Sequence, residues 1–106
     1  MDKDQQYKQD ILDAIEKIQS SLQGVSYDAF VSNDDLFDAN VRRLEIIGEA
    51  VKRLSQEYKN SKPEIPWKDI AGFRDVAIHD YATINAEIVW ATIQEDVPKL
   101  LQALNN

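Results

Sequence analysis

Apolar residues recur every three or four positions along most of this chain, which is the spacing of amphipathic helices. The first such stretch runs from about Asp4 to Gln23, and Gly24 is a natural stop for it. Its apolar positions are Tyr7, Ile11, Ala14, Ile15, Ile18 and Leu22. Residues 25–33 predict a connector with one helical turn, and Asn33 or Asp34 can cap the next helix.

The longest amphipathic stretch predicts a second helix that begins there and runs to about Tyr58. Its apolar positions are Phe37, Val41, Leu44, Ile47, Gly48, Val51, Leu54 and Tyr58. Basic residues fall largely off this stripe, as an amphipathic helix requires. Residues 60–65 predict a polar loop, and Pro66 suits a first helical position because its missing N–H is not needed there.

The remaining chain predicts a third helix from Trp67 to about Asp80 and, after a break at residues 81–85, a fourth helix capped by Asn85. Pro98 should kink the fourth helix or separate a last turn from it.

No segment alternates between polar and apolar residues, so no strand is predicted. The expected fold is all-α, an antiparallel bundle of four or five helices that forms one domain over residues 1–106.

The amino-acid composition excludes several kinds of functional site. The chain has 106 residues, no cysteine and one histidine, so it offers neither a disulfide framework nor a thiolate metal site, and no metal is expected. No apolar run approaches the roughly 18–20 residues of a membrane span, and the polar N-terminus is unlike a signal peptide. A cytoplasmic protein is therefore expected.

The net charge of −7 argues against a general nucleic-acid binder. Residues 39–66, however, carry six basic and four acidic side chains, so a polyanion would be expected there. The basic residues are Arg42, Arg43, Lys52, Arg53, Lys59 and Lys62. The alternative is that they form the solvated face of a long helix.

The stretch GFRDVAIHDYAT holds an Arg-x4-His-x-Tyr pattern made by Arg74, His79 and Tyr81. Together with LEIIGEAVKRL (44–54), IPWKDIAGFRDVAIHDYATIN (65–85) and EIVWATIQEDVPKLLQAL (87–104), it resembles the HEPN superfamily. Within that superfamily the chain is most similar to HepT-like toxins, which are paired with a minimal (MntA-like) nucleotidyltransferase antitoxin. The resemblance covers nearly the whole chain.

The resemblance implies a metal-independent ribonuclease toxin without a cofactor, with transfer RNA as a plausible substrate. His79 would serve as general acid or base, and Arg74 would hold phosphate oxygens. Tyr81 would be the residue that the antitoxin modifies with AMP from ATP. Glu49 belongs to the second-helix signature and would support Arg74 or lie in solvent, whereas Asp75 replaces the usual asparagine.

Helical geometry constrains this site. Arg74 and Tyr81 are seven positions apart and share a face of a regular helix, but His79 lies about 140° around from Arg74. Either the helix ends near His79 or a second subunit completes the site, and the resemblance favours a two-fold homodimer.

Two other functions stay open. The bundle could be a non-catalytic adaptor that presents a substrate or nucleotide to the nucleotidyltransferase, which its acidic charge suits. It could also be a structural dimerisation bundle, which would explain the apolar stripes but not the motif.

Overall fold

The computed structural model describes residues 3–73 and 85–105, and the regular elements in those ranges are all helical. They are α1 (Lys3–Ser21), α2 (Tyr27–Ser32), α3 (Asp34–Arg53), α4 (Gln56–Ser61), α5 (Trp67–Ala71), α7 (Ala86–Ala91), the π-helical segment η2 (Thr92–Asp96) and α8 (Val97–Leu104). The predicted all-α class is confirmed. None of the helices in these ranges combines the length and apolar composition needed to cross a membrane.

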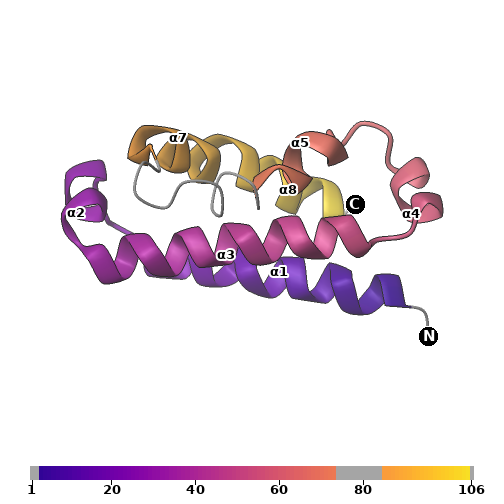
Figure 1. Cartoon of the computed structure of the whole chain (residues 1–106), viewed down its shortest axis with the longest axis horizontal. Helices are drawn as coiled ribbons and strands as arrows, with labels where there is room; N and C mark the ends of the chain where they lie inside the picture. Colours follow the sequence, from indigo (N-terminus) through magenta and orange to yellow (C-terminus); the bar gives the residue numbers. More distant parts are fainter. Residues whose placement is uncertain (1–2, 74–84, 106) are drawn as a thin grey trace.

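Helices α1 and α3 run antiparallel and make the most extensive contact between elements of the described chain (Figure 1). The short α2 lies at the end where α1 leads into α3, and α4 lies at the opposite end. Helices α5, α7 and α8 form a second layer over this pair, with α5 packed on α3 and α8 on α1.

Local backbone and side-chain features mark the end of α1 and the starts of α2 and α3. Gly24 takes a positive φ of 75° after α1, which is a backbone conformation that glycine adopts at little cost. Ser26 caps α2 by accepting a hydrogen bond from the Ala29 N–H, and Asn33 caps α3 by accepting one from the Leu36 N–H. The predicted connector turn and the predicted cap are both confirmed.

The prediction that the second helix runs to Tyr58 is wrong. Helix α3 ends at Arg53, because Leu54 adopts an extended backbone and Ser55 caps a new helix, α4. The Ser55 side chain accepts from the Tyr58 N–H at 3.0 Å. Serine side chains compete with helical hydrogen bonds in this way and so favour caps over helix interiors.

Pro66 and Pro98 both lie where the helices change. The sequence predicts Pro66 as the first residue of a helix, and the structure places it one position before that, as the N-cap of α5. Near Pro98 the last helix widens into η2, where the Val97 N–H donates to the carbonyl five residues back, at Thr92. Proline offers no N–H to the carbonyl of Gln94, so the helix changes its bonding before α8 begins.

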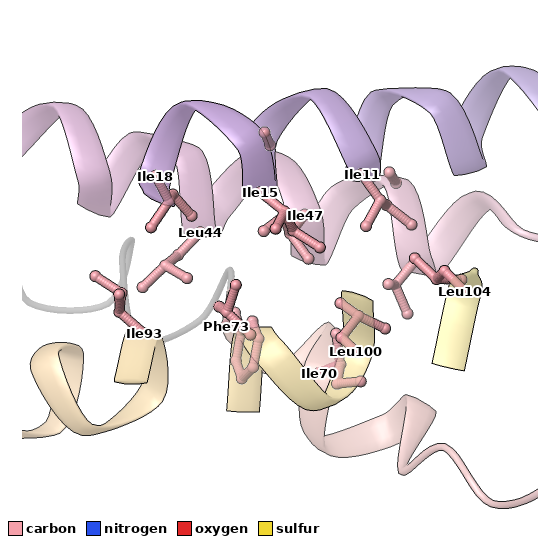
Figure 2. Close-up of a cluster of buried hydrophobic side chains, with 14 of the residues drawn as sticks. Ile11, Ile15, Ile18, Leu44, Ile47, Ile70, Phe73, Ile93, Leu100 and Leu104 are labelled. Carbon is pink, nitrogen blue, oxygen red and sulfur yellow. The ribbon is translucent and has the colours of Figure 1, made fainter. Parts of the chain in front are cut away.

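The core lies between the two layers. Figure 2 shows side chains of α1 and α3 pointing toward side chains of the second layer. The labelled members are Ile11, Ile15, Ile18, Leu44, Ile47, Ile70, Phe73, Ile93, Leu100 and Leu104, each at most 8% exposed. Burial of each such side chain contributes about 1.5–3 kcal/mol before conformational entropy is subtracted.

One buried polar side chain, Asn40, links α3 to α1. Its amide donates to the Leu36 carbonyl at 3.0 Å and to Ser21 Oγ at 3.2 Å. Its carbonyl accepts from Arg43 at 3.2 Å, and Arg43 also donates to Ser21 Oγ. The network satisfies a fully buried amide and fixes how the two long helices align.

A second link joins α1 to the start of α4. The Asp4 carboxylate accepts from the Ser55 N–H at 2.7 Å and from Ser55 Oγ at 2.5 Å. These hydrogen bonds, aided by the nearby Lys59 ammonium, lower the pKa of Asp4. Burial raises the pKa of Tyr58, as does the negative charge of Asp4.

Asn40→Ala should lower the free energy of unfolding by about 1–3 kcal/mol, because it leaves buried partners of the amide unpaired. Urea denaturation followed by circular dichroism measures this loss. Asn60→Ala, on the exposed surface of α4, is the matched control and should change stability by less than about 0.5 kcal/mol. Equal losses in the two variants would contradict the role of the Asn40 network.

Asp4→Asn should lower the Tm at neutral pH, because the amide cannot carry the charge that Ser55 stabilises. A carboxylate whose folded-state pKa is lowered stabilises the fold above its ordinary pKa of 3.8, and this contribution disappears as the pH falls through the folded-state pKa. Thermal melts should therefore converge with wild type in acid. Asp13→Asn, exposed on the same helix, is the matched control and should leave the Tm at neutral pH nearly unchanged.

Candidate active site

Four predicted site residues, Arg74, Asp75, His79 and Tyr81, lie outside the residues that the structure describes. Their shared face and mutual angles therefore stay predictions. The described residues that flank this segment show how the fold holds its two ends.

The chain that leads into Arg74 is fixed by packing and by hydrogen bonds from α5. Trp67 Nε1 donates to the carbonyls of Lys59 and Lys62, each at 3.1 Å. The side chains of Ile70 and Phe73 are buried in the core, and Phe73 is 8% exposed. The residue directly before the motif is thus held against the hydrophobic core.

The chain that follows the motif is fixed by α7. Asn85 accepts from the N–H groups of Glu87 and Ile88, so it caps α7 as predicted. One turn on, the Trp90 ring packs against Tyr27 and Phe30, with centroid distances of 5.8 and 5.1 Å. Both ends of the motif segment therefore connect to ordered, packed helices.

Glu49, the predicted supporting residue, is described by the structure and lies partly buried on α3. It borders a hollow of about 190 Å³ between α1 and α3, together with Tyr7, Arg42 and Arg53. Its predicted contact with Arg74 stays a prediction. The hollow carries both charge signs, because Asp10 also lines it.

Four of the six basic residues of the middle segment lie on α3, and they fall into two groups. Arg43 is engaged in the Asn40 network, and Arg42 forms an ion pair with Glu45 at 2.8 Å. Lys52 and Arg53 are exposed in the last turn of α3. The structure therefore assigns a structural role to Arg43, whereas the exposed Lys52 and Arg53 form no ion pair among the described residues.

A cavity of about 260 Å³ between α5 and α8 was not predicted from the sequence. Its walls include the apolar side chains of Ile70, Phe73 and Leu100. Three carboxylates, from Glu64, Asp69 and Asp96, border it beside a single lysine. This charge balance disfavours phosphate binding, so the cavity is a poor candidate for an RNA-binding site. No group of three or more potential metal ligands gathers among residues 3–73 and 85–105.

The sequence comparisons connect the chain to known proteins. Residues 11–106 match the family described as ribonuclease HepT-like. A protein of Caldanaerobacter subterraneus, provisionally named an RNase, is 44% identical over 94 residues, which span 89% of this chain and 84% of that protein. A protein of Thermococcus cleftensis, provisionally named ribonuclease HepT, is 38% identical over 89% of this chain and 86% of its own length.

A third relative, from Methanocaldococcus jannaschii and also provisionally named an RNase, is 34% identical over 86% of this chain and 84% of that protein. No solved structure is significantly similar to this chain. Because the family match spans nearly the whole sequence, and relatives above 30% identity align over most of their own length, the chain belongs to the HepT-like ribonuclease family.

Proposed function

We propose that this protein is the toxin of a toxin–antitoxin pair and acts as a metal-independent endoribonuclease, with transfer RNA as its proposed substrate. The observation that carries the proposal is the family match over residues 11–106, a range that contains Arg74, His79 and Tyr81. The names of the relatives support ribonuclease activity, and the pairing with an antitoxin follows from the resemblance of the motif.

In the proposed reaction, the ribose 2′-oxygen attacks the adjacent phosphorus while the bond to the 5′-oxygen breaks. The products are a 2′,3′-cyclic phosphate and a free 5′-hydroxyl. His79 suits the proton transfers because an imidazole has an ordinary pKa near 6.5. Arg74 suits the phosphate because its guanidinium can bind two oxygens and offset charge in the transition state.

The reaction needs one group to accept a proton from the 2′-hydroxyl and another to give one to the leaving oxygen. The chain has a single histidine, so two copies of His79 in a two-fold homodimer could divide these roles. Glu49 would position Arg74, whereas Asp75 would place a carboxylate beside it and weaken its phosphate contact.

The proposed regulation acts on Tyr81. An MntA-like nucleotidyltransferase antitoxin in the same cytoplasm would transfer AMP from ATP to the phenolic oxygen and release pyrophosphate. The toxin itself would bind no cofactor. AMP would place a bulky anion beside Arg74 and His79, where it would occupy the phosphate site and repel RNA.

His79→Ala should abolish RNA cleavage in excess EDTA without altering the circular dichroism spectrum, because it removes the proposed proton-transfer group. Gel analysis of a pool that contains transfer RNA measures cleavage, after mass spectrometry confirms that Tyr81 is unmodified. Full activity in the variant would exclude a catalytic role for His79. If wild type also fails to cut, the non-catalytic adaptor function, which the net charge of −7 suits, becomes the better explanation.

Tyr81→Phe should leave toxicity largely in place and abolish neutralisation, because phenylalanine has no oxygen to accept AMP. Growth assays with and without the antitoxin, and mass spectrometry of the purified toxin, measure the two effects. Loss of the fold in this variant would instead indicate that Tyr81 is a core aromatic residue.

A further inference from the structure

Charge is distributed unevenly along the 41 Å long axis of the molecule. Residues 18–41, which include α2 and the start of α3, carry four aspartates and no basic side chain. At the opposite end, residues 3–8 and 52–62 carry six basic and two acidic side chains. Figure 1 shows α2 at one end of the molecule, with the start of α1, the end of α3 and α4 at the other.

Only the fold brings the two basic segments together. The bonds from Asp4 to Ser55 join the first turn of α1 to the junction of α3 and α4. The Lys59 ammonium is also close enough to Asp4 to lower the pKa of that carboxyl. We call this surface the basic end, and its members are Lys3, Lys8, Lys52, Arg53 and Lys59.

Four carboxylates lie near the five cations of this surface. Asp4 binds Ser55, and Asp10 and Glu49 line the same hollow as Arg53. Lys52 and Arg53 are exposed, and among the described residues no ion pair to either is found. Glu57 remains as an exposed acidic neighbour on α4.

An aromatic ring adjoins these cations. Tyr7 is partly buried and lines the 190 Å³ hollow together with Arg53. Exposed cations track a phosphate backbone, and an aromatic face beside them can stack on an unpaired base. Lysine side chains and one aromatic ring do not distinguish one base edge from another. This arrangement therefore suits contacts that do not depend on the RNA sequence.

We propose that the basic end binds the sugar-phosphate backbone of the RNA substrate, with Lys52 and Arg53 as its main phosphate contacts. The inference rests on the proposed ribonuclease function and deepens it by locating substrate binding outside the Arg74–Tyr81 motif. The acidic end near α2 repels the same polyanion, so the charge asymmetry orients the protein on RNA. About three phosphate contacts on a single strand give a roughly twentyfold loss of affinity between 50 and 200 mM salt.

The test compares Lys52→Gln/Arg53→Gln with a control, Lys17→Gln/Lys99→Gln, that removes the same charge from exposed positions outside the basic end. Glutamine keeps a high helix propensity at all four positions. The probe is a fluorescein-labelled 2′-O-methyl RNA oligonucleotide, which lacks the 2′-hydroxyl needed for cleavage. Fluorescence anisotropy at 50 mM salt gives the Kd, and thermal melts confirm that each variant is folded.

The expected result is a roughly tenfold weaker Kd and a smaller salt dependence for Lys52→Gln/Arg53→Gln, with less than about a twofold change in the control. On cleavable RNA this variant should raise KM and leave kcat unchanged, since it loses binding outside the reacting atoms. Equal Kd values in both variants would overturn the proposal, because net charge alone would then explain binding. Competition by polyglutamate as strong as that by unlabelled RNA would also overturn it, in favour of an acidic protein partner.

These outcomes separate the inference from the proposed function. If wild type cleaves RNA and the Lys52→Gln/Arg53→Gln variant keeps its KM, the ribonuclease function stands and the basic end is not the RNA-binding surface. If wild type binds the probe through Lys52 and Arg53 but never cleaves RNA, the proposed catalysis fails and the binding surface stands.

Discussion

The packing of α1 against α3 is the contact on which the other elements depend. Isoleucines on one face of α1 contact the apolar stripe of α3. The paired helices form the layer against which α5, α7 and α8 pack. Hydrophobic burial has no preferred alignment, so it leaves the relative position of two long helices loosely specified. The buried Asn40 supplies that information, because its amide and carbonyl are satisfied only where Ser21 and Arg43 lie.

The two-layer arrangement holds the residues on both sides of the proposed active-site motif. The motif segment begins after the buried Phe73 and ends before Asn85, the cap of α7. Both flanks belong to the second layer and are held by contacts to the core, while the basic end is built from the first layer and α4. The proposed chemistry lies at the motif, and the proposed RNA-binding surface lies at the basic end.

Much of the fold could be predicted because its signals are local. The three-and-four spacing predicted the long helices, and the caps at Asn33 and Asn85 were confirmed where the side chain accepts from N–H groups of the next turn. The prediction that the second helix continues past Ser55 was wrong because the apolar stripe continues through Leu54 to Tyr58. Besides its local cap, Ser55 is bound at its N–H and hydroxyl by Asp4, which is 51 positions away in sequence.

The sequence by itself determined the helical class, the starts of α1, α3, α5 and α7, the HEPN-like motif and the family, because these depend on the order and spacing of neighbouring residues. It also identified Glu49 and the middle basic residues as candidates, but it could not separate them by role. Tertiary structure decided that Arg43 serves the Asn40 network, that Lys52 and Arg53 remain exposed, and that the start of α1 lies beside the junction of α3 and α4. Those outcomes depend on contacts between distant segments, which exist only after α1 and α3 have packed.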